Sequence, residues 1–355
     1  MSFQITVQPS GRTFSADPDE AILPAAIRQG IGLPYGCKDG ACGSCKCKKL
    51  EGTVVHGTHQ TKALSHEEEA AGYILTCCAV PQTDVLLESR QVTDESAFPI
   101  KKMPSRVLAL EKKSHDVMLV RLQLPANDTM RYHAGQYVEF ILRDGARRSY
   151  SMANAPHTLV SDPAVTPSTP PGIELHIRHM PGGKFTDHVF NAMKEKEILR
   201  VEGPYGSFFL REDSTKPMVL LASGTGFAPI KALIEHMRHK GITRPATLYW
   251  GGRRPDDLYL DSWVQDQLAA MPQLKYVPVI SNALPEDNWT GRTGFVHRAV
   301  LEDFPDLSGH QVYACGAPIV VDSARAEYSA QAGLPPDEFY ADSFTTEADK
   351  HKETA

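Results

Sequence analysis

The chain has 355 residues and a formal net charge of −6, and 41% of its residues are hydrophobic. This length predicts two or three domains. The mildly acidic balance excludes the basic surface that nucleic-acid binding requires. No apolar run approaches the roughly 20 residues that span a bilayer, and no export segment is recognised at the start. We therefore expect a cytoplasmic protein with neither nucleic-acid nor membrane partners. We also expect a monomer.

The first residues predict a small domain of strands and short helices. Residues 3–7 alternate between apolar and polar side chains, as a half-buried strand does, and Gly11 predicts the hairpin turn that follows. Residues 21–29 predict a short helix that ends at a glycine. Ser65 with Glu68 has the pattern of a capping box at the start of a second helix.

Four cysteines in this region are the most informative motif of the chain. Cys37, Cys42 and Cys45 have the spacing C-x4-C-x2-C, and Cys77 follows later. This is the ligand pattern of a plant-type 2Fe-2S cluster, and the glycines between the cysteines permit a close backbone approach. The alternatives are structural zinc, which usually uses short C-x2-C pairs, and disulfides, which are disfavoured without an export segment.

Cys77 is followed directly by Cys78. Neighbouring side chains of an extended segment point to opposite sides, so we expect only one of the two to bind the cluster. The segments YGCKDGACGSCKCKKLEG and YILTCCAVP resemble a plant-type ferredoxin domain over residues 1–92. The resemblance implies a β-grasp fold and makes Cys77, directly after Leu-Thr, the fourth ligand. Cys78 and Cys47 are then expected to be small apolar core residues.

Residues 93–103 are polar, contain proline and lack periodicity, so they predict a linker. Short strands between turns then predict a small antiparallel β-barrel over residues 104–210. One helix, about residues 185–193, interrupts the strands. The segment 156–172 is rich in proline, serine and threonine, and we interpret it as an exposed loop, most simply a tolerated surface insertion.

A second motif lies within the predicted barrel. It comprises Arg148, Ser149, Tyr150 and Ser151. A guanidinium group can bind a phosphate in a fork, and alternation sends Tyr150 and Ser151 to opposite sides of the strand. An ordinary strand with an outward arginine is the alternative.

A glycine-rich segment supports the functional interpretation of that motif. Gly182, Gly183, Lys184 and Thr186 lie at a predicted helix start, where free N–H groups attract pyrophosphate. Together with GPYG at 203–206, both motifs resemble the flavin site of the ferredoxin-NADP reductase superfamily. The resemblance implies that FAD rather than FMN binds, that Tyr150 packs on the isoalloxazine, and that Ser151 hydrogen-bonds near N5.

Residues 211–347 predict a third domain. The apolar run 218–222 fits a buried parallel strand, and a helix ends at Gly241. Between them lies a loop that contains Gly224, Thr225, Gly226 and Pro229. Strand, glycine loop and helix form a phosphate-binding unit, although Pro229 replaces the third glycine of GxGxxG. Further β/α units predict a doubly wound parallel sheet.

The loop GTGFAP resembles the nucleotide loop of the same reductase superfamily. The sequence CGAP begins at Cys315 and Gly316, at the carboxyl end of a predicted strand. The resemblance places Cys315 beside the reacting nicotinamide, whereas a small buried cysteine is the alternative. Phe344 corresponds to a terminal aromatic that covers the flavin, or it anchors the tail. Residues 348–355 form a polar tail.

As a whole, the chain resembles the ferredoxin-first iron-sulfur flavoprotein reductases. The family serves multicomponent oxygenases, and CDP-deoxyglucoseen reductases share the architecture. The resemblance implies electron transfer from NADH through FAD and the 2Fe-2S cluster to an oxygenase component or another one-electron acceptor protein. A deoxysugar dehydratase is the second acceptor considered, and a non-catalytic electron carrier or redox sensor is the third interpretation. The intact motifs disfavour that third interpretation.

The nucleotide preference depends on the segment after the second β/α strand. Arg253 and Arg254 could bind the 2′-phosphate of NADPH. Asp256 and Asp257 beside them would repel that phosphate or pair with the arginines. We therefore expect NADH, with NADPH possible.

Overall fold

The computed structural model describes residues 2–92, 98–126, 130–159 and 172–345. The described residues separate into two compact units. One unit draws on Met1–Pro99, Gly206–Phe208 and Ala341–Ala355, and the other on Ile100–Tyr205 and Phe209–Tyr340. Part of the predicted linker, most of the predicted 156–172 loop and the tail lie outside the described residues. Among the described helices, none has both the length and the apolar character of a membrane span.

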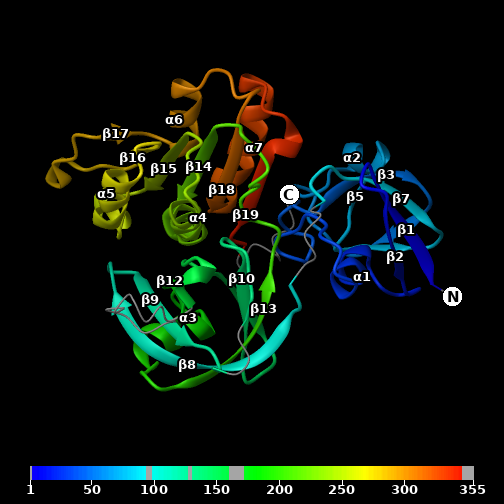
Figure 1. Cartoon of the computed structure of the whole chain (residues 1–355), viewed down its shortest axis with the longest axis horizontal. Coiled ribbons are helices and arrows are strands. Elements are labelled where there is room, and N and C mark those ends of the chain that lie inside the picture. Colours follow the sequence, from blue (N-terminus) through cyan, green and yellow to red (C-terminus); the bar gives the residue numbers. More distant parts are fainter. Residues whose placement is uncertain (1, 93–97, 127–129, 160–171, 346–355) are drawn as a thin grey trace. The chain divides into compact units, whose positions relative to one another are not determined.

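The first unit is a mixed sheet with two short helices (Figure 1). Its main sheet has the order β2-β1-β7-β3-β5, in which β1 and β7 are parallel, and β4 pairs with β6. Ile5, Val7 and Leu87 are fully buried, so the strand alternation seen in the sequence defines the core face. The elements are β1 (Phe3–Gln8), β2 (Arg12–Ala16), α1 (Ile22–Arg28), β3 (Lys46–Glu51), β4 (Val54–His56), α2 (His66–Ala70), β5 (Tyr73–Leu75), β6 (Ala79–Pro81) and β7 (Val85–Glu88).

The predicted capping box is present at the start of α2. The Ser65 hydroxyl accepts a hydrogen bond from the Glu68 N–H at 3.2 Å, and the Glu68 carboxylate accepts one from the Ser65 N–H at 2.9 Å. Two otherwise unpaired helix donors are thereby satisfied. This local prediction is confirmed.

The second unit begins with a six-stranded antiparallel sheet of order β11-β10-β13-β8-β9-β12. A bridge between Met152 and Leu175 joins the two edge strands, so the sheet closes on itself as a barrel. Ile173, Leu175 and Ile177 are fully buried inside it. Its elements are β8 (Lys101–Lys112), β9 (Val117–Gln123), β10 (Tyr137–Ile141), β11 (Arg147–Ser151), β12 (Ile173–Arg178), α3 (Lys184–Asn191) and β13 (Ile198–Tyr205).

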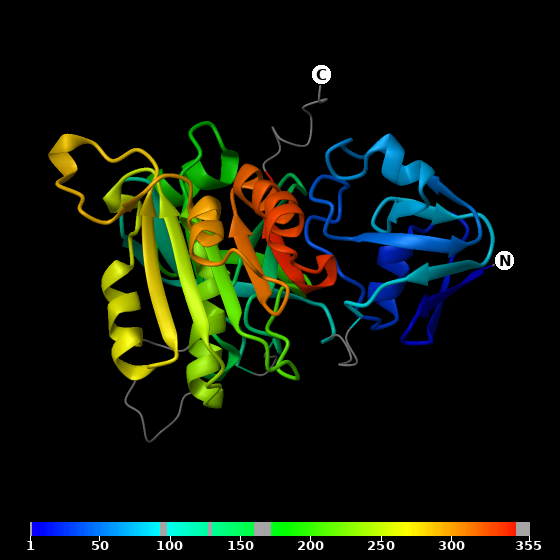
Figure 2. The same ribbon diagram turned by 90° about the horizontal axis from the view of Figure 1, so that it is seen from above.

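A parallel sheet of order β17-β16-β15-β14-β18-β19 completes this unit, and its strands lie side by side in Figure 2. Helices α4 and α5 cover one face and α6 and α7 the other (Figure 1). The strand order reverses between β14 and β18, and ligands bind at such a switch point. The elements are β14 (Met218–Ser223), α4 (Phe227–Lys240), β15 (Ala246–Gly252), α5 (Asp261–Ala270), β16 (Leu274–Ile280), β17 (Arg292–Thr293), α6 (Val296–Asp303), β18 (Gln311–Gly316), α7 (Pro318–Ala332) and β19 (Phe339–Ser343).

Candidate cofactor sites

The four predicted cluster ligands come together as two pairs of thiols. Cys45 Sγ lies 3.2 Å from Cys77 Sγ. Cys42 Sγ accepts the backbone N–H of Cys37 at 3.4 Å, and the two thiols also hydrogen-bond each other. The hydrogen bond from Cys37 lowers the pKa of the Cys42 thiol and so favours the thiolate that binds metal. Two pairs of sulfur ligands suit a cluster of two irons.

The backbone around these thiols is folded as closely as a cluster requires. Gly40 has a φ of +77°, which favours glycine. A Cβ at this position would lie 2.8 Å from Cys78 Sγ and 2.9 Å from the Cβ of His59. At Gly36 a Cβ would lie 3.3 Å from the Sγ of the predicted ligand Cys42. Side chains at these glycines would crowd the thiols, so the residues present fit the cluster.

Cys78 differs from its predicted position. An extended segment would send the side chains of Cys77 and Cys78 to opposite sides, but the two residues lie in a turn between β5 and β6. The two sulfurs are 3.4 Å apart, and Cys78 is only half-buried at the edge of the core. The expectation that they point to opposite sides is therefore wrong. Cys47 is a core residue, as predicted, and burial raises the pKa of its thiol to about 12.

The predicted flavin motifs approach each other through aromatic rings packed at the barrel core. The ring of Tyr150 on β11 lies 5.5 Å from that of Phe185, in the first turn of α3, and 5.8 Å from that of Phe140. Ser151 is buried and Tyr150 half-buried. The strand motif and the glycine-rich helix start are thus brought together.

The start of α3 has no side-chain cap, because Gly183 occupies the N-cap position. The N–H groups of Gly182 and Gly183 already donate to Asp187 Oδ2 at 3.1 Å and to the carbonyl of Met180 at 2.8 Å, so a phosphate would bind the N–H groups of the first helical turn. Thr186 donates its hydroxyl to the carbonyl of Met180 at 2.9 Å, which holds the preceding loop. Lys184 pairs with Asp144 at 2.8 Å on the exposed side. An uncapped helix start beside an aromatic ring fits the pyrophosphate and ring system of FAD.

The other residues of the strand motif are more accessible. Arg148 is half-buried, and its Nη1 donates to the carbonyl of Arg147 at 2.7 Å. Ser149 is exposed. A guanidinium at this depth can bind a phosphate without the cost of full burial.

The nucleotide loop lies against the end of β18, at the switch point of the parallel sheet. A Cβ at Gly226 would stand 2.1 Å from the carbonyl oxygen of Cys315, and one at Gly316 would stand 2.3 Å from that of Ser223. Parallel pairing of β14 with β18 sets this register, with Ala222 opposite Cys315. Only glycine permits such backbone contact.

Aromatic residues contact this loop and hold its backbone. The rings of Phe227 and Trp250 stack with centroids 3.9 Å apart, and Trp250 Nε1 donates to the carbonyl of Gly224 at 3.0 Å. Thr225 and Pro229 are buried in the same region. The loop therefore has a fixed conformation that suits a dinucleotide backbone.

Cys315 and Phe344, the remaining two predicted site residues, differ in solvent exposure. Cys315 is 1% exposed, so its thiol is buried at the strand end. Phe344 is half-buried and follows directly after β19. The roles of both residues stay predictions.

The segment after β15 is organised around two carboxylates. Asp257 is buried and accepts the backbone N–H groups of Arg253 and Arg254 at 2.7 and 3.0 Å. The Arg254 guanidinium pairs with Asp287, with Nε donating to Oδ2 at 2.8 Å. Arg253 is exposed. The acidic partner of Arg254 is therefore Asp287, far along the chain, which the sequence did not indicate.

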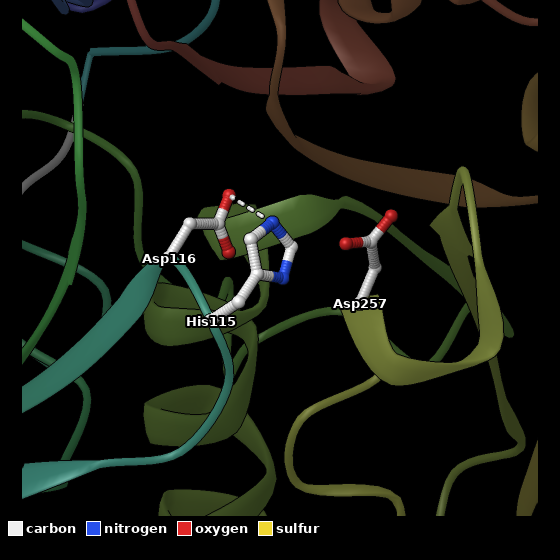
Figure 3. Close-up of side chains that lie close together, drawn as sticks. All are labelled: His115, Asp116 and Asp257. Atoms are coloured by element: carbon white, nitrogen blue, oxygen red, sulfur yellow. Dashed lines mark ion pairs between the residues drawn. The ribbon is translucent and has the colours of Figure 1, made fainter.

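A cluster of potential metal ligands lies near this segment (Figure 3). His115, Asp116 and Asp257 present ligand atoms within 4.8 Å of one another. Asp257 already accepts the two backbone N–H groups, and Asp116 pairs with Arg178 Nε at 3.1 Å. Both carboxylates thus have structural partners, and we assign no metal to the cluster.

Several polar residues beside the nucleotide loop are not predictable from the sequence. Arg178 lies so near the loop that a Cβ at Gly224 would be 2.7 Å from its Nη1. Glu174 and Lys231 form a buried ion pair at 3.1 Å. In the sequence, Glu174 and Arg178 alternate with apolar residues and look like the solvated face of a strand. The only local signal for Lys231 was its i,i+4 spacing to Glu235 on α4.

Comparison with known proteins agrees with this geometry. The sequence matches the 2Fe-2S iron-sulfur cluster binding domain over residues 5–82, the oxidoreductase FAD-binding domain over 104–210 and the oxidoreductase NAD-binding domain over 220–326. It is 39% identical to the CDP-6-deoxy-L-threo-D-glycero-4-hexulose-3-dehydrase reductase of Yersinia pseudotuberculosis, covering 97% of this chain and 99% of that protein. The chain belongs to the iron-sulfur flavoprotein reductases.

Other similar proteins are a reductase component of a dioxygenase and a cytochrome P450 reductase. The chain is 35% identical to the terephthalate 1,2-dioxygenase reductase component 2 of a Comamonas species, covering 98% of each chain. Among solved structures, it is similar to the Amycolatopsis cytochrome P450 reductase GcoB, with a TM-score of 0.76, 31% identity and coverage of 97% and 99% of the two chains. These similarities confirm the predicted fold class, the oxidoreductase activity and the cofactors, which are a 2Fe-2S cluster, FAD and a nicotinamide nucleotide.

Proposed function

We propose that the reductase takes electrons from NADH and delivers them singly to the terminal component of a multicomponent oxygenase. The observation that carries the electron path is the convergence of motifs at three sites of one chain. Two pairs of thiols converge in the first unit, Tyr150 meets the α3 start, and the loop at Gly226 contacts the end of β18. When bound, the flavin would supply the chemistry that links a two-electron hydride donor to a one-electron acceptor.

In this proposal the residues of the second unit bind and orient FAD and the nicotinamide nucleotide. Arg148 and the N–H groups at the start of α3 bind the FAD phosphates, because an arginine fork and a helix N-terminus both favour anions. Tyr150 would support the flavin ring, and Ser151 would donate a hydrogen bond near N5. The loop from Gly224 to Gly226 would bind the nucleotide diphosphate, and Cys315 would lie beside the nicotinamide.

In the first unit, Cys37 and Cys42 would hold one iron, and Cys45 and Cys77 the other. The pairing of the thiols supports this division. Phe344 would cover the flavin until the nicotinamide arrives.

The acceptor can be tested with purified partner proteins. The NADH-reduced reductase would be mixed anaerobically with an oxygenase component from the same organism, and reoxidation of the cluster would be followed by its visible absorption. We expect reoxidation at least about tenfold faster than with an unrelated oxygenase component, because surface complementarity raises the association rate. Equal rates with both would contradict a dedicated partner.

A deoxysugar dehydratase is the second candidate acceptor. It is favoured by the 39% identity to the dehydrase reductase of Yersinia, which exceeds the 35% to the dioxygenase reductase of Comamonas. In the same reoxidation experiment, a dehydratase from this organism that outpaces its oxygenase components would assign the reductase to deoxysugar synthesis.

We also infer a preference for NADH over NADPH. Arg254 could bind a 2′-phosphate, but the Asp287 carboxylate pairs with it, and Glu286 lies 3.6 Å from the same guanidinium. Both acidic residues would repel the additional phosphate. Steady-state kcat/KM for the two nucleotides tests this inference. A monomer in the cytoplasm stays our prediction, which size-exclusion chromatography and cell fractionation would check.

A further inference from the structure

A buried group of charges connects the barrel with the helix that follows the nucleotide loop. Lys231 Nζ on α4 lies 3.1 Å from Glu174 Oε1 on β12 and 2.6 Å from Glu235 Oε1. The Lys231 and Glu174 side chains are only 7% and 3% exposed. Charges this deeply buried are costly unless they are fully paired. Figure 1 shows α4 on the face of the parallel sheet that is directed toward β12.

Two members of this group also bind the backbone that follows the flavin motif. Lys231 Nζ donates to the carbonyl of Ala153 at 3.1 Å. Glu235 Oε2 accepts the N–H of Ala155 at 2.9 Å. Ala153 is two residues beyond Ser151, and Lys231 is one turn beyond the loop at Gly226. A short, hydrogen-bonded path therefore joins the two predicted cofactor motifs.

The neighbours of Glu174 and Lys231 determine which side chains of this group are charged. Arg121 lies 2.6 Å from Glu174, and His176 Nε2 donates to the same carboxylate at 3.0 Å. The hydroxyl of Tyr259 then donates to His176 Nδ1 at 2.8 Å. Burial lowers the pKa of His176, so this histidine is neutral at pH 7. Burial opposes the charge of Lys231, but the neighbouring carboxylates outweigh it and raise its pKa.

We propose that Lys231 and Glu235 are positioning residues for hydride transfer. They hold the nucleotide loop, through α4, at a fixed place relative to the strand that supports the flavin. This inference rests on the proposed flavin and nucleotide sites. Hydride transfer depends steeply on the approach of the two reacting atoms, and a displacement of about 1 Å can cost on the order of 100-fold in rate.

The first test compares Glu235→Ala with Glu235→Gln. The glutamine keeps an oxygen for the Ala155 N–H and loses only the ion pair with Lys231, whereas the alanine removes both interactions. In single-turnover reactions of the holoenzyme with NADH, we expect the rate of flavin bleaching at 450 nm to fall at least about tenfold in the alanine variant and less than twofold in the glutamine variant. Flavin content should be equal in both.

A second readout is independent of activity. Deuterium uptake of a peptide covering residues 150–157 should rise in Glu235→Ala and remain at the wild-type level in Glu235→Gln, with or without bound FAD. Indistinguishable uptake and bleaching rates in the two variants would overturn the proposal. Failure of the proposed function is a separate result, because wild-type protein itself would then fail to bleach with NADH.

The third test separates positioning from charge balance. Lys231→Met leaves Glu174 with one cation fewer, whereas Lys231→Met with Glu174→Gln removes opposite charges together. We expect the double variant to recover thermal stability but not bleaching rate, because the bond to the Ala153 carbonyl is still missing. Recovery of the wild-type rate in the double variant would contradict positioning by Lys231. If Lys231→Met does not fold, the Glu235 pair decides.

Discussion

Substitution of Gly226 by alanine tests whether the nucleotide loop must touch the end of β18. The added Cβ would stand 2.1 Å from the carbonyl oxygen of Cys315 and 2.4 Å from its carbonyl carbon, whereas real Cβ contacts essentially never fall below 3.0 Å. Relief requires a displacement of 0.9 Å (3.0 − 2.1), and the obstacle is backbone rather than a flexible side chain. Such overpacking costs about 1–3 kcal/mol of stability.

The functional cost should exceed the structural one. A shift of about 1 Å at the reacting groups predicts a loss on the order of 100-fold in the NADH-driven rate of flavin bleaching. Flavin content should not change, since the predicted FAD motifs lie on the barrel. Stopped-flow absorbance at 450 nm measures the rate.

Gly309→Ala is the matched control. Gly309 precedes β18, and a Cβ there would meet nothing within 4 Å. We expect this variant to bleach at the wild-type rate. If Gly226→Ala keeps its flavin and its bleaching rate is within about threefold of the wild-type rate, the placement of the nucleotide at this loop is refuted.

Two further predictions concern specificity and the cluster. Asp287→Asn removes the negative charge that pairs with Arg254, so kcat/KM for NADPH should rise about threefold to tenfold relative to kcat/KM for NADH. An unchanged ratio of the two values would show that Arg254 does not approach the 2′-phosphate. Cys77→Ser should abolish the cluster's visible absorption and its reduced-state paramagnetic resonance signal, whereas Cys78→Ala and Cys47→Ala should keep both, with about 1 kcal/mol of lost packing. A cluster that survives Cys77→Ser but not Cys78→Ala would move the fourth ligand by one residue.

Local patterns were sufficient to predict most of the fold. The alternation of residues 3–7, the Ser65–Glu68 capping box and the apolar run 218–222 each specify an element through its immediate neighbours. Strand alternation failed at Cys78, because the turn that contains it breaks the period of two. No residue in the segment signalled that turn.

The site was predictable where backbone geometry requires glycine and where ligands follow a fixed spacing. The cysteine ligands and the loop at Gly226 are such cases. Partners that meet only through tertiary folding were not predictable. Glu174 and Lys231 are far apart in sequence, and each looks like a solvated charge on an amphipathic element. The same holds for Arg254 and Asp287, whose pairing depends on how the chain returns after β16.

The central claim is that hydride acceptance and one-electron delivery are separate functions of one chain. Cys42→Ser tests it most directly, because this thiol is a cluster ligand in the first unit and every residue assigned to bind FAD phosphates or nucleotide lies in the second. We expect NADH-driven reduction of cytochrome c to be lost, while NADH-driven reduction of ferricyanide stays close to the wild-type rate. Loss of both activities in a folded protein that retains FAD would show that the two functions are not separate.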